Sequence, residues 1–224
     1  MPHEKKKIRI HSLHEMRSEE RKIVCVTAYD AITGRWADAA GVDLVLIGDS
    51  LCSTALGLPN TLKMTLEWTI HHSLAVSRTV KNALRVGDMP FLTYKVSAEQ
   101  ALTNAGRLVQ EANVEAVKME GGMEVTPMIE RVVHAGIPVM GHIGLQPQSL
   151  HKQGGYRLQG QGEEGRQKLI QDARVLVDSG VFALVLEKIP PDLAELISSE
   201  ISVPTIGIGA GSGCGGQILV MADL

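Results

Sequence analysis

Short apolar runs recur along the chain, and most of them are followed by a stretch with helical periodicity. Eight runs predict β-strands, and their side chains are apolar without alternation, which is typical of strands covered on both faces. The predicted strands span residues 22–27, 44–47, 83–86, 116–119, 138–140, 183–186, 204–208 and 217–221.

Six stretches between these runs predict helices. Ser97 and Gln100 have the spacing of a capping box at the start of one stretch. Gly136 and Gly180 follow two others, where glycine commonly ends a helix. The predicted helices span residues 32–40, 66–82, 98–111, 127–135, 163–179 and 191–199.

The alternation of strands and helices predicts a parallel sheet joined by right-handed crossovers. Eight strand candidates favour an α/β fold closed into a TIM (β/α)8 barrel, with an open, doubly wound sheet as the alternative. We expect a single catalytic domain over residues 1–224, with a short N-terminal helical extension. The basic segment 3–9 is expected to be a solvated chain end.

The end of the chain departs from this pattern, because no closing helix is predicted after the last strand. Residues 222–224 are only Ala-Asp-Leu, so one flank of the first and last strands is expected to lack its covering helix. Three explanations remain open at this point: an incomplete chain, a partner chain that covers the flank, or a wrong strand count.

Composition excludes several classes of function. The 224 residues carry a net charge of −3, which is too balanced for a nucleic-acid surface or a polybasic membrane patch. No apolar stretch reaches the roughly 18 residues of a membrane span, and the N-terminus lacks a signal-peptide core. Cys25, Cys52 and Cys214 fit neither a disulfide framework nor a CxxC zinc site. We therefore expect a cytoplasmic protein without nucleic-acid or membrane partners.

Acidic residues stand at the carboxyl ends of four predicted strands, where barrel enzymes carry their active groups: Asp49, Asp88, Glu120 and Glu187. Left unpaired in a partly dry site, these carboxylates would repel one another. A hard divalent cation would relieve the repulsion, and an oxygen-only ligand set favours Mg²⁺ over zinc. We expect Asp49 and Asp88 to bind the ion directly and Glu120 to bind it directly or through water. Glu187 is then free to act as a base.

Simpler interpretations exist for these acids. Asp49 and Asp88 could cap helix N-termini, the commonest task of an aspartate after a strand, and Glu187 could be a solvated loop residue or could start a helix. Capping does not require four acids and a lysine at the strand ends of one rim, so the convergence favours the metal site.

Two further polar residues have similar alternatives. Glu120 could form an ion pair with Lys118 or Lys188, and both lysines could equally be solvated charges at the rim. His142 could be a core histidine that donates to a backbone carbonyl, and taken alone this is the favoured interpretation. Gly211, Gly213 and Gly216 match GxGxxG, but a strand follows them rather than a helix, so they predict a tight turn and not a dinucleotide site.

Short motifs in the chain resemble, in order, those of the ketopantoate hydroxymethyltransferase family, which acts on 3-methyl-2-oxobutanoate in pantothenate biosynthesis. The match runs from about residue 10 to the end of the chain, and the ordered set is specific although each motif is short. The motifs are TAYD at 27–30, GDS at 48–50, DMPF at 88–91, VKMEGG at 117–122, GHIGLQPQS at 141–149, GGYRLQGQ at 154–161, LVLE at 184–187 and IGIGAG at 206–211.

The resemblance implies a transferase with a TIM barrel, Mg²⁺, and 5,10-methylenetetrahydrofolate as the one-carbon donor. It also implies ring-based homo-oligomers, a decamer among them. Residue by residue, it places the metal at Asp49, Asp88 and Glu120, and the catalytic base at Glu187. The contacts to the 2-oxo acid are then assigned to Asp49, Ser50, Asp88 and Lys118, with His142 lining the same site.

The chain also departs from the family pattern at three positions. Gly215 replaces the usual aspartate, Gln161 a basic residue and Lys63 a proline. These departures bear on loop geometry and on folate contacts rather than on the metal site.

Two other functions remain as alternatives. One is a magnesium-dependent lyase or mutase of the phosphoenolpyruvate mutase and isocitrate lyase group, although that group's cysteine-bearing loop is not apparent here. The other is a non-catalytic structural subunit or a fragment, which the missing closing helix suggests.

Overall fold

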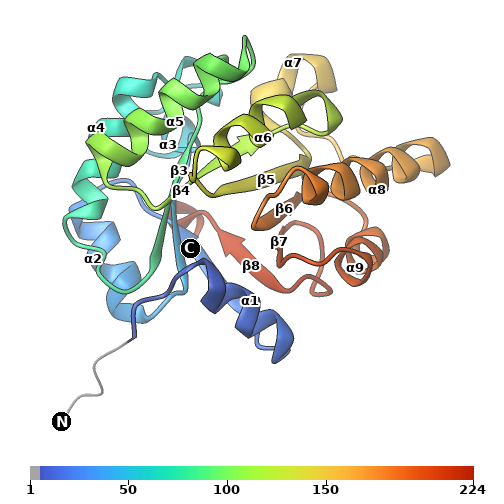
Figure 1. Cartoon of the computed structure of the whole chain (residues 1–224), viewed down its shortest axis with the longest axis horizontal. Helices are drawn as coiled ribbons and strands as arrows, with labels where there is room; N and C mark the ends of the chain where they lie inside the picture. The colour runs from blue at the N-terminus through green and yellow to red at the C-terminus, as the bar shows by residue number, and fades with distance from the viewer. Residues whose placement is uncertain (1–5) are drawn as a thin grey trace.

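The computed structural model describes residues 6–224, and these form a closed barrel of eight parallel strands surrounded by helices (Figure 1). Each strand pairs with the next, and β8 closes the barrel by pairing with β1. The TIM barrel that the alternation predicted is therefore confirmed. The strands are β1 (Ile23–Thr27), β2 (Leu44–Ile47), β3 (Leu84–Asp88), β4 (Ala116–Glu120), β5 (Val139–Gly144), β6 (Ala183–Glu187), β7 (Thr205–Ile208) and β8 (Gly216–Leu219).

Helices cover the outside of the barrel (Figure 1). The α-helices are α1 (Ile10–Ser18), α2 (Ala31–Ala40), α3 (Leu51–Thr54), α4 (Leu66–Ser77), α5 (Ala98–Ala112), α6 (Thr126–His134), α7 (Leu150–Gln153), α8 (Gly162–Asp178) and α9 (Pro191–Glu200). Short 3-10 helices are η1 (Thr61–Lys63), η2 (Met123–Val125), η3 (Pro147–Ser149) and η4 (Met221–Asp223). Of the basic segment 3–9, residues 3–5 lie outside the described part of the chain. The rest is not a solvated end as predicted, because Lys7 Nζ donates to the Ala83 carbonyl at 2.8 Å and pairs with Glu115 at 2.7 Å.

Alternate side chains of most strands point into the barrel or outward beneath the helices, and both sets are buried. Val24 of β1 and Leu219 of β8 point outward and are 52% and 51% exposed, so no helix of the described residues covers this flank, as the sequence predicted. In β2, Leu44 and Leu46 belong to the apolar cluster inside the barrel, whereas Val45 and Ile47 belong to the cluster under the helices. This burial on both faces explains why the strands lack the alternation of half-exposed strands. Leu13 of α1 joins the inner cluster, so this helix packs against one end of the barrel.

One predicted helix is too long, because a tertiary contact ends it. The sequence predicts a helix over 66–82, but α4 ends at Ser77. The backbone amides of Asn82 and Ala83 each donate to Asp38 Oδ1 at 2.9 Å. The Asp38 side chain of α2 therefore accepts the hydrogen bonds of these amides. In a longer helix, the same amides would have donated to carbonyl groups of that helix.

Two strand predictions also need correction. β5 continues to Gly144, four residues beyond the predicted end at 140, so His142 lies within the strand and not after it. β8 ends at Leu219, because only Gly216–Leu219 pairs with β1, and Met221 lies in η4. In the described residues after β8, η4 is the only regular element.

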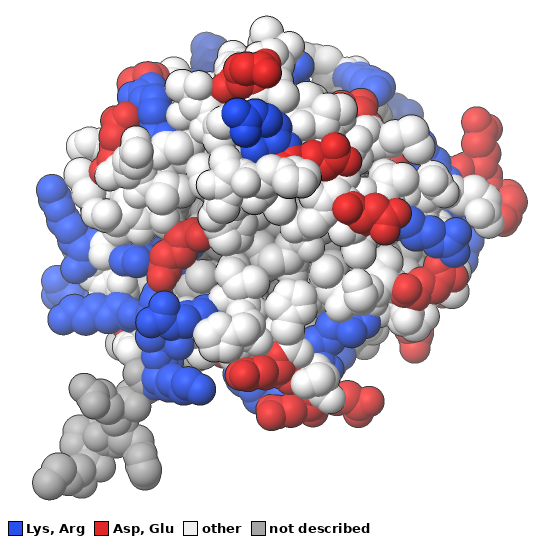
Figure 2. Space-filling view, in the orientation of Figure 1, with Lys and Arg blue, Asp and Glu red and all other residues white. Residues whose placement is uncertain are grey.

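The surface carries charges of both signs. Figure 2 shows lysine, arginine, aspartate and glutamate side chains mainly around the edge of the visible face, with lysine and arginine prevailing at the lower left. Within residues 6–224, no helix combines the length and apolarity that crossing a bilayer requires.

We expect Gly144→Ala to destabilise the fold. The φ angle of Gly144 is +94°, and a Cβ there would lie 2.2 Å from the carbonyl oxygen of Glu187. Backbone strain of this kind is worth about 1–3 kcal/mol, and the clash adds to it, so the free energy of unfolding in urea should fall by at least about 2 kcal/mol.

Gly106→Ala in α5 is the matched control. No heavy atom lies within 4 Å of its Cβ position, and alanine favours a helix interior by roughly 1 kcal/mol. We expect this variant to be as stable as the parent protein or more stable. Parent-like stability of Gly144→Ala would contradict the close approach of β5 and β6 at this point.

Candidate active site

The predicted site residues continue the inward-facing series of the strands. Leu84 and Val86 of β3 point into the barrel, and Asp88 is the next residue on that face. The same alternation places Glu120 and Glu187 inward at the ends of β4 and β6. A polar layer therefore lies on top of the apolar interior, at the end of the barrel where such enzymes carry their active groups.

Lys118 lies at the centre of this layer and is almost completely buried. Its ammonium nitrogen is 2.9 Å from Asp88 Oδ1 and 3.5 Å from Glu120 Oε1. The same nitrogen is 3.2 Å from His142 Nδ1. One cation thus contacts two carboxylates and an imidazole that come from three different strands.

Asp49 and Asp88 lie side by side. The Asp49 backbone amide donates to Asp88 Oδ2 at 3.1 Å, and Asp49 Oδ2 accepts from Gln148 Nε2 at 3.0 Å. Both side chains are buried, and within the described residues neither carboxylate caps a helix. The structure therefore brings together the two aspartates that the sequence placed on one rim.

The pKa values reflect burial and crowding of charge. Burial, and then the charges of Asp88 and Glu120, raise the pKa of Asp49 well above its usual range. Burial also raises the pKa of Asp88, against the opposing effect of Lys118. For Glu120, burial is outweighed by Lys118 and His142, which lower its pKa to about 2. Burial opposes the charge on Lys118, but the surrounding carboxylates raise its pKa above the usual value.

His142 joins the buried cluster to Glu187. Its Nε2 lies 3.2 Å from Glu187 Oε2. Burial and Lys118 oppose protonation of the ring, but the carboxylates of Glu120 and Glu187 raise its pKa to about 9. A raised pKa favours a ring that is protonated on both nitrogens. The Lys118 ammonium, which lies 3.2 Å from Nδ1, can only donate, so this contact requires an Nδ1 without a proton. Nδ1 therefore accepts from Lys118, and the ring proton lies on Nε2, within ion-pair distance of Glu187 although without good hydrogen-bond geometry.

A cavity of about 100 Å³ lies above this polar layer. Ser50 lies on its wall, and the Ser50 hydroxyl is 2.7 Å from the hydroxyl of Tyr29, which in turn accepts from Thr27 at 3.0 Å. All the predicted site residues contribute to the lining, which comprises Thr27, Leu46, Gly48, Asp49, Ser50, Asp88, Lys118, Glu120, His142, Pro147, Val185, Glu187, Ile208, Ile218 and Val220.

Two residues to which the sequence gave no role, Gln148 and Tyr94, hold the acids in place through hydrogen bonds. Gln148 Nε2 donates to Asp49 Oδ2 and also to the Met89 carbonyl, at 3.0 and 2.9 Å. Its backbone amide donates to Glu120 Oε2 at 3.1 Å, and its Oε1 accepts from the Tyr94 hydroxyl at 2.9 Å. Both side chains are buried. Gln148 lies in the motif GHIGLQPQS, but the resemblance gave it no role, and for Tyr94 the only signal was a tyrosine after a strand, which many solvated residues share.

The donor set fits a hard divalent cation. Asp49, Asp88 and Glu120 bring three carboxylates against the single ammonium of Lys118 in one buried region. Asp88 Oδ1 has no hydrogen bond of good geometry among the described residues, although Lys118 lies within ion-pair distance. No preassembled group of three metal-ligating side chains occurs within residues 6–224. Magnesium commonly uses only one or two carboxylates together with water or substrate oxygens, and the adjacent Asp49 and Asp88 match that requirement.

Comparison with known proteins identifies the family. The family model described as ketopantoate hydroxymethyltransferase matches residues 7–224. The chain belongs to this family. Two relatives are named 3-methyl-2-oxobutanoate hydroxymethyltransferase. The protein of Thermoanaerobacter sp. (strain X514) is 51% identical to this chain, and the match covers 95% of this chain and 78% of the relative. The protein of Anaeromyxobacter sp. (strain Fw109-5) is 52% identical, and the match covers 98% of this chain and 73% of the relative.

Solved structures of more distant proteins share the fold. A phosphonopyruvate hydrolase described in complex with oxalate and Mg²⁺ superimposes with a TM-score of 0.70 at 14% identity, over 95% of this chain and 80% of that one. A 2,3-dimethylmalate lyase of the phosphoenolpyruvate mutase and isocitrate lyase superfamily gives 0.66 at 17% identity, over 95% and 81%. At this identity the likeness shows the barrel alone, and the family match favours the transferase over the lyase alternative.

The three departures from the family pattern do not line the cavity. Gln161 is exposed before α8, and Lys63 is exposed in η1. Gly215 lies between β7 and β8, where its amide donates to Thr205 Oγ1 at 3.0 Å. None of the three is among the residues that line the cavity.

We expect Asp49→Asn to stabilise the cation-free protein at pH 7. Because folding raises the pKa of Asp49, the folded chain holds this proton more tightly than the unfolded chain, and stability falls as the pH rises. Removing the charge should raise the free energy of unfolding by on the order of 1 kcal/mol or more. The gain should shrink as the pH is lowered towards about 4, where the unfolded carboxyl is also protonated.

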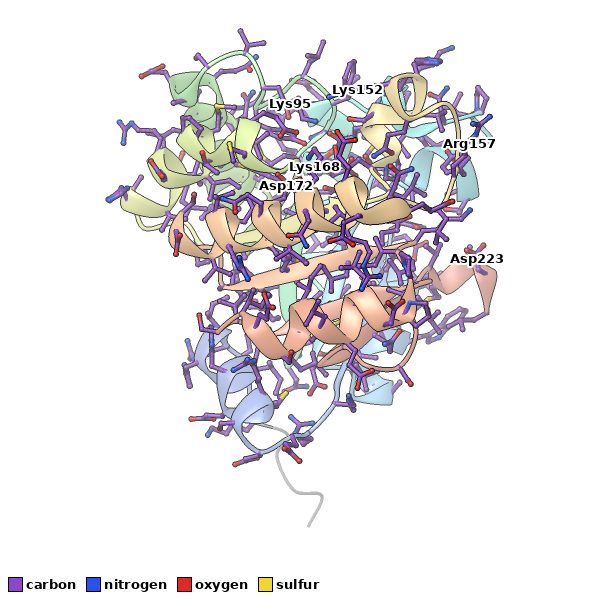
Figure 3. All side chains as sticks on the ribbon, turned by 90° about the vertical axis from the view of Figure 1, so that its right-hand side faces the viewer. Lys95, Lys152, Arg157, Lys168, Asp172 and Asp223 are labelled. Carbon is purple, nitrogen blue, oxygen red and sulfur yellow. The ribbon has the colours of Figure 1, made fainter. Side chains whose placement is uncertain are left out.

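The measurement is urea denaturation in a chelator at several pH values, with Asp223→Asn as the control. Asp223 is exposed at the same end of the barrel (Figure 3), so its substitution should leave stability unchanged at every pH. A cation-free Asp49→Asn protein less stable than the parent at pH 7 would show that Asp49 is not under electrostatic repulsion.

Proposed function

We propose that this chain transfers a hydroxymethyl group from 5,10-methylenetetrahydrofolate to 3-methyl-2-oxobutanoate and forms 2-dehydropantoate. One observation carries the proposal. A chain of the ketopantoate hydroxymethyltransferase family has Asp49, Asp88, Lys118, Glu120 and Glu187 around one small cavity at the carboxyl ends of its strands.

The proposed metal ligands are Asp49 and Asp88, with Glu120 as a direct or water-mediated third ligand. When bound, Mg²⁺ would polarise the keto oxygen of the oxo acid and lower the pKa of its C3 hydrogen. The proposed contacts of the chain to the oxo acid are Asp49, Ser50, Asp88, Lys118 and His142, all of which line the cavity.

Lys118 supplies positive charge where negative charge develops. Its buried ammonium is held by Asp88 and Glu120, so it keeps its position and its charge while the substrate reacts. A fixed charge in a site that excludes water stabilises an enolate oxygen without reorganisation of solvent. Lys118 thus lowers the free energy of the state that follows loss of the C3 proton.

Glu187 is the proposed base. Its side chain is 20% exposed, compared with 1% for Glu120, so it lies at the mouth of the cavity and not on its floor. His142 Nε2 lies 3.2 Å from Glu187 Oε2, within ion-pair distance although without good hydrogen-bond geometry, and Oε1 has no partner in the described residues. A carboxylate held at one oxygen and free at the other is suited to take the C3 proton.

The overall reaction is balanced by one water molecule. A carbon–carbon bond forms between C3 of the oxo acid and the methylene carbon, and both carbon–nitrogen bonds of the methylene bridge break. Water supplies the hydroxyl oxygen of the product. Tetrahydrofolate leaves with two new N–H bonds, whose protons come from C3 and from water.

Exchange of the C3 proton of 3-methyl-2-oxobutanoate for deuterium tests metal, base and substrate together, and it requires no folate. We expect Glu187→Gln to slow exchange by about 10²- to 10⁴-fold and to leave magnesium-dependent binding of the oxo acid intact in calorimetry. Asp88→Ala should abolish that binding, because it removes a proposed metal ligand.

Glu99→Gln is the matched control for charge, since Glu99 is an exposed carboxylate on α5, and it should exchange at the parental rate. A parental exchange rate in Glu187→Gln would show that the base is another residue. Failure of the parent protein to bind the oxo acid with Mg²⁺ would instead support the non-catalytic alternative.

The setting of the reaction is also a proposal. We propose one catalytic domain over residues 1–224, a ring-based homo-oligomer such as a decamer, and a cytoplasmic location. The first two follow from the barrel and from the family resemblance. The third is supported by Cys25, Cys52 and Cys214, which are all buried and unbridged, as is usual in a reducing compartment.

A further inference from the structure

The small cavity determines where a folate can lie, if the proposed function holds. At about 100 Å³ it suits the oxo acid, and a folate is several times larger than that acid. Asp88, Lys118 and Glu120 form its floor with side chains that are 1–4% exposed, whereas Glu187 is 20% exposed. The methylene group must therefore reach C3 from outside, past the open side of Glu187.

The surface beside Glu187 is a loop of residues 154–161, which follows α7 and is fixed to the end of β6. Lys188, the residue after Glu187, donates from Nζ to the Tyr156 carbonyl at 2.5 Å and accepts at its own carbonyl from the Gln159 amide at 3.0 Å. Lys188 is also held to β7, since its amide donates to the Ile208 carbonyl at 2.8 Å. Its φ of +48° is a left-handed conformation that a lysine adopts at some cost. Two hydrogen bonds through Lys188 thus position the loop relative to the proposed base, and a third fixes Lys188 to β7.

Tyr156 presents its ring to solvent at this place. The side chain belongs to a residue that is 47% exposed, and its hydroxyl has no hydrogen bond among the described residues. Burial and the charges of Asp49, Glu187 and Glu120 raise the pKa of its phenol, so the ring lies within electrostatic reach of the acidic site. Leu158, two residues on, is 40% exposed. An aromatic and an aliphatic side chain are therefore left uncovered next to the mouth of the cavity.

Positive charge accompanies this surface. Arg157 lies between the two apolar residues, and Lys152 of α7 precedes the loop; both are exposed, and neither has an ion pair within residues 6–224. Figure 3 shows Arg157 at the same end of the barrel as Asp223, which follows β8. A folate has a flat pteridine ring at one end and glutamate carboxylates at the other, so a ring face next to unpaired cations matches both ends of the molecule.

We propose that the Tyr156 ring is the surface on which the pteridine of the methylene-folate stacks, with Leu158 beside it. Lys188 is a positioning residue that holds this loop over the open side of Glu187. Stacking on an aromatic side chain binds any flat heterocycle and needs no hydrogen bond from the tyrosine hydroxyl. The ring itself, and not the hydroxyl, is therefore the group that matters. This proposal rests on the proposed function, because it names the site of the second substrate.

The test is steady-state kinetics with each substrate varied in turn, together with C3 exchange, which needs no folate. We expect Tyr156→Ala to raise the KM for 5,10-methylenetetrahydrofolate by about 5- to 150-fold, the range for loss of a stacked base. Its KM for the oxo acid and its exchange rate should change by less than about twofold. Tyr156→Phe keeps the ring and should restore the parental folate KM.

Lys188→Met is the second variant, and it leaves Tyr156 in place. We expect its folate KM to rise, because the loop loses its hydrogen bond to the Lys188 side chain. The rate of C3 exchange should be retained, because the substitution leaves the contacts of the site acids unchanged. A purely structural role of Lys188 would instead lower exchange and turnover together. Denaturation in urea should give both variants parental midpoints, since Tyr156 is exposed and Lys188 is only partly buried.

The outcomes separate this proposal from the function on which it rests. If the parent protein neither exchanges the C3 proton nor turns over folate, the proposed function is wrong and the folate site fails with it. If the parent does both and Tyr156→Ala retains the parental folate KM, only the stacking surface is wrong. A loss in Tyr156→Phe as large as that in Tyr156→Ala would also overturn it, because the hydroxyl would then be the essential group.

Discussion

The contact of the Lys118 ammonium with buried carboxylates is the interaction on which the rest of the site depends. Carboxylates at this depth can ionise together only where positive charge lies among them. Lys118 meets part of that requirement by contacting Asp88 and Glu120. The negative charge that remains, centred on Asp49 and Asp88, is the physical basis of the proposed magnesium site.

The barrel accommodates this charge by separating it from the core along one axis. Inward-facing positions are apolar at the amino ends of the strands, and the polar ones lie towards the carboxyl ends, as Leu84, Val86 and Asp88 illustrate. The apolar layers stabilise the fold, whereas the polar layer, without a cation, destabilises it through burial and repulsion. Stability and chemistry therefore come from different levels of the same strands.

Loops complete the site from distant parts of the chain. Gln148, which follows β5, donates to Asp49, 99 residues earlier in the sequence. Tyr94 in turn donates to Gln148, from which it is separated by 54 residues. Hydrogen bonds from residues behind the carboxylates fix the direction of the carboxylate lone pairs and so prepare the site for its ligand. On the outer side, Lys188 joins the end of β6 to the loop of Tyr156, which links the mouth of the cavity at Glu187 to the surface where the second substrate is proposed to bind.

The sequence by itself determined the barrel and its acidic rim, because apolar runs and the period of two in a strand report burial directly. It placed Asp88 and Glu187 at strand ends, and the structure brings both to one cavity. Only the tertiary structure decided that Gln148 supports the acids, that His142 lies within β5 facing Lys118, and that Asp38 ends α4 early. Each of these rests on a hydrogen bond between segments far apart in the chain. Such a bond depends on how loops and strands pack, and local periodicity carries no information about it.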